Sequence, residues 1–103
     1  MPPDYAALKQ AFADKAYALT ARASTRAISR DIDDFEIEEA VISGMMIEDY
    51  PEDKYGPSCL ILGYTRSGRL LHVQVTYPPK VRVITVYEPS PDEWESDGKT
   101  RKS

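Results

Sequence analysis

The spacing of apolar residues changes at Gly44, and this change constrains the fold more than any other feature of the chain. Before Gly44, apolar residues recur every three or four positions, which is the period of an α-helix. After Gly44, short segments rich in Val, Ile, Leu and Tyr alternate with clusters of Gly, Pro and Ser, which is typical of β-strands joined by turns. Helices followed by strands predict a two-layer α+β fold.

The first part of the chain predicts two helices. The segment 5–23 is rich in Ala, Leu, Lys and Gln, which favour helix, and the helix can continue to about Ser29. The segment 33–44 predicts a second, shorter helix, because Asp33 or Asp34 can cap its start and Gly44 can end it. We therefore expect one long and one short helix ahead of the strands.

The second part of the chain predicts about four antiparallel strands. They are expected at 45–50, 58–65, 70–77 and 81–89, with turns between them. The 103 residues suffice for one core, so we expect a single α+β domain over residues 1–95. The polar segment 96–103 is expected to be a loose tail, while Trp94 is expected to dock on the domain.

The side chains around the only histidine, His72, follow from the pairing of the central strands. If Ser67 and Gly68 form a two-residue turn, His72 lies opposite Gly63 on a face of mixed polarity that also carries Gln74. The other face is then wholly apolar and should pack on the helices, with Leu60, Leu62, Tyr64, Leu71, Val73 and Val75. The register of the last strand is open. We favour Thr85 and Tyr87 beside His72, because Ile84 and Val86 suit the core better.

Charge is unevenly distributed in a chain whose net charge is −4. The segment 31–53 holds ten acidic residues and no basic one, whereas 66–82 holds four basic residues and no acidic one. A negative net charge argues against coating by nucleic acid through bulk electrostatics. A local basic patch can still bind a phosphate backbone.

Composition also narrows the class of protein. Cys59 is the only cysteine, so no disulfide framework is expected and a reducing cytoplasm is the default location. No apolar run approaches the roughly 20 residues that cross a bilayer, so no membrane partner is expected. One His and one Cys do not make the usual zinc ligand set, and glycine-rich nucleotide motifs are missing. We therefore expect neither a metal nor a cofactor.

Two sets of residues are candidates for function, each with a structural alternative. His72 could transfer protons, or it could be a half-buried strand residue with one hydrogen bond. Arg22, Arg26 and Arg30 are spaced to share one helix stripe, which could bind phosphate or could be a solvated face paired with nearby acids. We expect Cys59 to be buried and chemically inert.

Several motifs together resemble a family of small bacterial proteins catalogued as a domain of unknown function. They are T-x-R-A-x-x-R-A-x-x-R-x-I at 20–32, E-E-A-V-I-S-G at 38–44, I-E-D-Y-P-E-D at 47–53, G-P-S-C-L-I-L-G-Y at 56–64, G-R-L-L-H-V at 68–73 and I-T-V-Y-E-P at 84–89. That family is similar to the RelE-type toxins, which are small metal-independent ribonucleases. Its members are often encoded beside a zinc-finger or helix-turn-helix protein that looks like an antitoxin. The resemblance covers about residues 15–95.

The resemblance implies two or three helices packed on a four-stranded antiparallel sheet, with a ribonuclease site on the open face of the sheet. Metal-free RNA cleavage needs a base, a cation that stabilises the phosphorane, and an acid. The expected catalytic residues are His72, Arg26 and Tyr87, and the expected RNA-binding residues are Arg22, Arg30, Gln74 and Tyr77. Bases could stack on Tyr55 or Tyr77. RNA and an antitoxin-like protein are the expected partners.

One departure from the family pattern leaves a second hypothesis open. The family commonly has His at the position of Arg22. If that His is the general base, this chain is a poor nuclease, whereas Arg serves well if the position only binds phosphate. The alternative is a non-catalytic module that binds a basic protein through the acidic strip 31–53. The nuclease hypothesis gains if the three arginines and His72 line one cleft, and it weakens if Asp31, Asp33 or Asp34 pair with the arginines.

Overall fold

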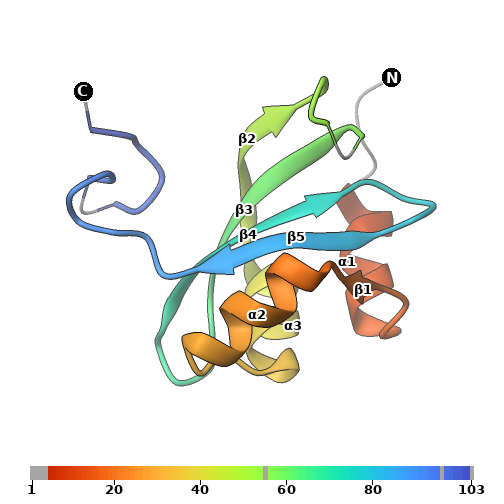
Figure 1. Ribbon diagram of the computed structural model, residues 1–103, viewed down its shortest axis with the longest axis horizontal. Coiled ribbons are helices and arrows are strands. Elements are labelled where there is room, and N and C mark those ends of the chain that lie inside the picture. Colours follow the sequence, from red (N-terminus) through yellow and green to blue (C-terminus); the bar gives the residue numbers. More distant parts are fainter. Residues whose placement is uncertain (1–4, 55, 96, 103) are drawn as a thin grey trace.

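Three helices pack on one face of a five-stranded sheet in the computed structural model, which describes residues 5–54, 56–95 and 97–102 (Figure 1). The helices are α1 (Tyr5–Ala13), α2 (Ala21–Ser29) and α3 (Asp34–Ser43), and the strands are β1 (Ala18–Leu19), β2 (Met45–Tyr50), β3 (Ser58–Tyr64), β4 (Leu70–Thr76) and β5 (Arg82–Tyr87). The sheet order is β1-β5-β4-β3-β2. The α+β class is confirmed. The expected four-stranded antiparallel sheet is wrong, because β1 adds a fifth strand that runs parallel to β5.

The single helix expected over residues 5–23 is divided into α1 and α2. Lys15 takes a positive φ of 58° just after α1, and the chain then extends so that Ala18 and Leu19 pair with β5. Thr20 caps α2, because its hydroxyl oxygen accepts the backbone N–H of Ala23 at 3.1 Å and donates to the backbone oxygen of Ile84. Strand pairing and this cap outweigh the helix propensity of the segment.

The second expected helix is confirmed as α3. The Glu36 carboxylate accepts the backbone N–H of Asp33 at 3.2 Å, which holds the start of the helix, and Gly44 follows its last residue. The helix lies close against β3, since a Cβ atom at Gly63 would lie only 1.8 Å from the backbone oxygen of Ala40. Gly63 is therefore required for this contact between helix and sheet.

The expected two-residue turn between β3 and β4 is wrong by one residue. The Gly68 N–H donates to the Thr65 oxygen at 2.9 Å, and the left-handed Gly68 (φ 89°) makes a turn of three residues, 66–68. His72 therefore pairs with Leu62 rather than Gly63. This shift moves β3 to the opposite parity, so Cys59, Ile61 and Gly63 face the helices, while Leu60 and Leu62 join His72. On β4, the expected core residues are confirmed, with Leu71, Val73 and Val75 all fully buried.

The favoured register of the last strand is confirmed from Thr85 to Tyr87 but is wrong at Ile84, because Val83 pairs with Val75 and takes the place in the core cluster. Tyr87 pairs with His72 and Thr85 pairs with Gln74, while Val86 packs in the core. An irregularity between Gln74 and Val75 shifts the register further along β5.

The hydrophobic core lies between the sheet and the helices. Its fully buried side chains include Leu8, Phe12, Ile37, Val41, Ile61, Leu71, Val73, Val75, Val83 and Val86. None of the helices in the described ranges is long and apolar enough to span a membrane.

The C-terminal segment lies on the side of the sheet away from the helices, toward one end of the strands (Figure 1), where it packs against His72. Trp94 is 3% exposed, which confirms that it docks. The segment 97–102, expected as a loose tail, turns back in this structure so that Trp94 bridges to Arg101 and Arg101 reaches Glu48 on β2. Residues 94, 95 and 97–102 and the face on which they pack define the surroundings of His72.

Candidate functional site

His72 lies in the middle of β4 and is completely buried on the face away from the helices. Its Nε2 atom is 2.5 Å from the backbone oxygen of Gly98, and its Nδ1 atom is 3.3 Å from the Tyr87 hydroxyl. A carbonyl oxygen only accepts hydrogen bonds, so Nε2 carries a proton. In the neutral ring, Nδ1 then accepts the proton of the Tyr87 hydroxyl. The two side chains form one hydrogen-bonded pair.

Aromatic rings and an ion pair enclose the imidazole. The Trp94 ring stands nearly perpendicular to it, with ring centroids 4.3 Å apart. The Arg101 guanidinium lies 4.6 Å from the centre of the Trp94 ring and donates to both oxygens of Glu48, at 2.9 and 3.0 Å. The Tyr50 hydroxyl also donates to Glu48. Arg101 thus ties the cover over His72 to β2.

Burial controls the protonation of this site. It lowers the pKa of His72, against the opposing effects of the Gly98 hydrogen bond and the negative charge of Glu48. It raises the pKa of Tyr87, although the positive charges of Arg101 and Arg26 act in the opposite direction. The hydrogen bonds from Arg101 lower the pKa of Glu48. At neutral pH the centre therefore holds a neutral imidazole, a neutral phenol and a carboxylate paired with a guanidinium.

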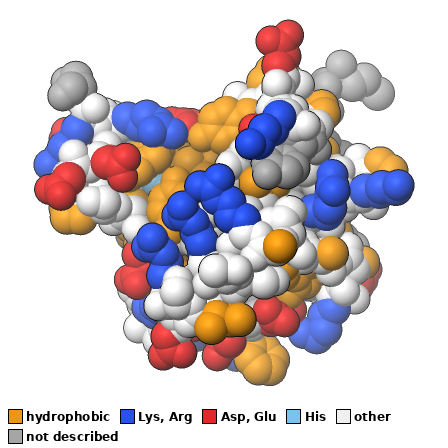
Figure 2. Space-filling model, viewed as in Figure 1, with side chains coloured by type: hydrophobic (Ala, Val, Ile, Leu, Met, Phe, Trp, Pro, Cys, Tyr) orange, Lys and Arg blue, Asp and Glu red, His pale blue; other side chains and the backbone are white. Residues whose placement is uncertain are grey.

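The arginine stripe belongs to α2, which carries Arg22 and Arg26, is followed by Arg30 at its C-cap, and packs against β5, the strand of Tyr87. Arg22 and Arg30 are exposed and Arg26 is partly exposed. None of the three guanidinium groups forms an ion pair or hydrogen bond within the part of the chain that the structure describes. Figure 2 shows Lys and Arg side chains gathered beside hydrophobic surface above α2. Of the three, Arg26 is the one whose charge acts on Tyr87.

The acids expected to neutralise the stripe do not do so. Asp31, Asp33 and Asp34 leave Arg22, Arg26 and Arg30 unpaired in the described ranges, which keeps the phosphate-binding hypothesis open. The complementary expectation, that His72 opens into a shared cleft, is not met, because no part of His72 is exposed.

The other expected RNA-binding residues lie elsewhere. Gln74 shares the face of His72, but its amide donates to the Ser58 hydroxyl at 3.1 Å. Tyr77 follows the end of β4, packs against the core on the helix side and donates to Asp49 at 2.6 Å. Tyr55 lies outside the described residues. The structure thus brings together His72, Tyr87 and the charge of Arg26, and separates Tyr77 from them.

Cys59 lies on the helix side of β3, away from His72, and is 1% exposed. Burial raises the pKa of its thiol to about 11. The described residues hold no group of three or more His, Cys, Asp or Glu side chains arranged to bind a metal ion.

Sequence reasoning missed the residues that close the site. Gly98 is 26 residues from His72, and Arg101 is 53 residues from Glu48, so no local spacing connects these partners. The single available signal was Trp94, since a lone tryptophan in a polar segment tends to be buried.

Comparison with known proteins identifies the family. The sequence model of a protein family, the domain of unknown function DUF4258, matches residues 19–88. The match runs from the last residue of β1 to just beyond the end of β5. No curated protein and no solved structure matches the chain. The matched region covers most of the chain and includes the arginine stripe, His72 and Tyr87. The chain belongs to the DUF4258 family.

Proposed function

We propose that this protein is a metal-independent endoribonuclease of the RelE-toxin kind, in which α2 binds RNA phosphates and the His72–Tyr87 pair transfers protons. One observation carries the proposal. Three arginines without ion pairs or hydrogen bonds in the described ranges lie on and just after α2, which packs against β5, and the charge of Arg26 acts on Tyr87, whose hydroxyl is hydrogen-bonded to the buried His72. Arg is suited to phosphate because its planar guanidinium can donate two hydrogen bonds in parallel.

Because His72 is buried, RNA cannot reach it directly, and we propose that RNA first contacts Tyr87. Tyr87 is partly exposed, so the 2′-hydroxyl proton can pass to the phenol oxygen while the phenol proton moves to Nδ1 of His72. The 2′-oxygen then attacks phosphorus, and the bond from phosphorus to the 5′-oxygen breaks. The pair returns a proton to the leaving 5′-oxygen, while the arginines stabilise the charge on the phosphorane. A neutral imidazole, kept neutral by burial, suits the role of base.

Arg22 fits this scheme as a phosphate ligand. It occupies the position where the family commonly has His, and it lies exposed on α2, which also carries the partly exposed Arg26. In this chain the base is then assigned to His72, and the α2 position contributes charge.

The test is cleavage of labelled single-stranded RNA by pure protein in EDTA. We expect the parent to cleave, and we expect Tyr87→Phe and Arg26→Ala each to lose about 10²-fold in rate. Arg66→Ala is the matched control, because Arg66 has a 91% exposed side chain on the turn between β3 and β4. Circular dichroism shows that each variant is folded. No cleavage by the folded parent, or equal loss in the Arg66 control, contradicts the proposal.

The alternative, a binding module with one acidic strip over 31–53, needs revision on this structure. Glu48 is hydrogen-bonded to Arg101, and Asp49 is hydrogen-bonded to Tyr77, so these two acids make contacts within the fold. Other acids of the strip lie beside exposed apolar side chains. These are Asp33, Asp34, Glu38 and Glu39, which are on α3 or just before it. A protein-binding role, including one for an antitoxin-like partner, is therefore a second proposal, limited to the surface around α3 (Asp34–Ser43).

A further inference from the structure

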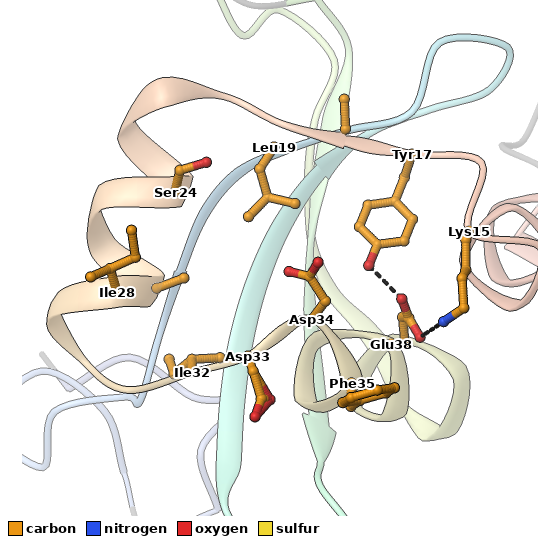
Figure 3. A pocket seen from close by; sticks show the side chains of 12 residues that line it. Lys15, Tyr17, Leu19, Ser24, Ile28, Ile32, Asp33, Asp34, Phe35 and Glu38 are labelled. Atoms are coloured by element: carbon orange, nitrogen blue, oxygen red, sulfur yellow. Dashed lines mark hydrogen bonds and ion pairs between the residues drawn. The ribbon is translucent and has the colours of Figure 1, made fainter.

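Two adjoining grooves flank α3 on the helix side of the molecule. One, of about 790 Å³, lies between α2, β1 and α3, and is shown in Figure 3. The other, of about 620 Å³, lies between α3 and the end of β3. Phe35 and Glu38 line both grooves, so the two form one continuous surface, here called the α3 surface.

Large apolar side chains are concentrated on the α3 surface. Ile28 is 83% exposed, Phe35 68%, Tyr64 57% and Ile42 42%. These are four of the six exposed large hydrophobic residues in the described ranges, the others being Met45 and Met46 on β2. Full burial of one such side chain by a partner contributes about 1.5–3 kcal/mol, so a cluster of four is a strong candidate for contact with another molecule.

Carboxylates outnumber cations around the same grooves. The lining contains Asp33, Asp34, Glu38 and Glu39 but only Lys15 and Arg66. Glu38 is paired with Lys15 at 2.8 Å, and Glu39 is paired with the highly exposed Arg66 at 3.5 Å. Asp33 and Asp34 form no ion pair in the described parts of the chain, and Figure 3 shows the Asp34 side chain pointing into the groove between α2 and α3.

This charge selects the kind of partner. A second copy of the chain docking through the same surface would place carboxylates against carboxylates, which is unfavourable. A partner with Lys or Arg beside its apolar side chains would place cations next to Asp33 and Asp34. Two grooves that flank one helix and carry exposed apolar side chains suit a docked helix, whose own apolar residues recur at helical spacing.

We propose that the α3 surface is the docking site for a basic amphipathic helix of another protein. Its apolar side chains pack around Phe35 in the two grooves, and its Lys or Arg side chains contact Asp33 and Asp34. This role goes beyond the proposed ribonuclease activity and does not depend on it, because α3 and His72 lie on opposite faces of the sheet.

The probe is a synthetic helical peptide of about 18 residues, or about five turns, with Leu along one face and Lys on the other. One control peptide keeps the Leu residues and replaces Lys with Glu, and a second keeps the Lys residues and replaces Leu with Ala. Each is titrated into the ¹⁵N-labelled full chain. We expect the amide signals of Ile28, Phe35 and Ile42 to shift with the first peptide alone.

Variants locate the binding and separate it from folding. Phe35→Ser and Asp34→Asn should each weaken binding by about tenfold, which corresponds to about 1.4 kcal/mol. Met45→Ser is the matched control, since Met45 is 50% exposed and lies outside both grooves. The proposal is overturned if the acidic peptide binds equally well. It is also overturned if the signals that shift are centred on Arg22 and Arg26, or if no signal shifts at about 1 mM peptide. Self-association that Phe35→Ser abolishes in sedimentation also overturns it, because the occupant is then a second copy.

Discussion

The Nε2 atom of His72 donates to the backbone oxygen of Gly98 at 2.5 Å, across 26 residues of sequence. This bond and the perpendicular Trp94 ring fix the C-terminal segment over the middle of β4. The protonation of His72 and the position of the segment are therefore coupled, because an imidazolium in this enclosed site loses the solvation that it has in water.

We expect the stability of the protein to fall as the pH decreases through the range in which unfolded His72 takes up a proton. Burial lowers the pKa of His72 below its ordinary value of 6.5, so the unfolded chain binds the proton more readily than the folded one. The neutral His72 contributes its full stabilisation above about pH 6.5. As the pH falls from there toward the pKa of His72 in the folded protein, the free energy of unfolding decreases by up to about 1.4 kcal/mol per pH unit. Urea unfolding at several pH values measures this.

The control for that measurement is His72→Gln, which retains a hydrogen-bonding side chain that does not titrate. Because His72 is the only histidine, the slope between about pH 7 and about pH 5.5 should disappear in the variant. The carboxylates with lowered pKa are Glu38 and Glu48, with an ordinary value of 4.5, and Asp97, with an ordinary value of 3.8, so they lose their stabilising effect at lower pH. An unchanged slope in His72→Gln would show that His72 is not the source.

Trp94→Ala should uncover His72. Loss of a buried tryptophan costs on the order of 3 kcal/mol, here expressed mainly as release of the C-terminal segment. Water then reaches the imidazole, so the pKa of His72 should rise toward 6.5, as followed by the ring proton signal in NMR. Lys99→Ala, an exposed change in the same segment, should leave that pKa unchanged. An equal pKa in the parent and Trp94→Ala contradicts the role assigned to the ring.

Arg69→Ala should destabilise the fold more than Arg66→Ala. The Arg69 guanidinium donates to the Glu36 and Glu88 carboxylates and to the backbone oxygens of Arg30 and Asp31, and so holds the connection between α2 and α3 against the sheet. Removing these bonds should cost about 1.5–3 kcal/mol. The exposed Arg66 side chain forms a single ion pair, so Arg66→Ala should lower the free energy of unfolding by less than about 0.5 kcal/mol. Equal midpoints of urea unfolding for the two variants would falsify this role of Arg69.

Gly63→Ala should prevent α3 from packing on β3. The added methyl group would meet the backbone oxygen and Cα of Ala40, and backbone cannot move aside as a flexible side chain can. We expect loss of the cooperative thermal transition. Gly68→Ala, at a turn with positive φ and open space, should cost only about 1–2 kcal/mol from backbone strain. Similar thermal midpoints for both variants would exclude the close approach.

Native Cys59 should resist thiol reagents. Burial excludes the reagent and raises the pKa of the thiol to about 11, so little thiolate is present at neutral pH. Ellman's reagent should react slowly with the folded protein and rapidly in urea. Fast reaction of the folded protein would mean that β3 opens to solvent.

The sequence alone determined the elements whose signals are local. The change of period at Gly44 separates helices from the main strands, and the acidic start and glycine end of α3 define that helix. Alternation along the last strand left its register open but favoured Tyr87 beside His72, which the structure confirms. These predictions succeed because capping and side-chain alternation depend on residues close in the chain.

Tertiary structure decided the features that depend on long-range contacts. Pairing of Ala18 and Leu19 with β5 divides the expected long helix, although the segment itself favours helix. The left-handed Gly68 sets a three-residue turn, and one residue of register exchanges the two faces of β3. Gly98 and Trp94 bury the histidine that the sequence placed on a half-open face. In each case the local alternatives differ by about 1 kcal/mol or less per residue, so pairing and burial between distant segments determine the result.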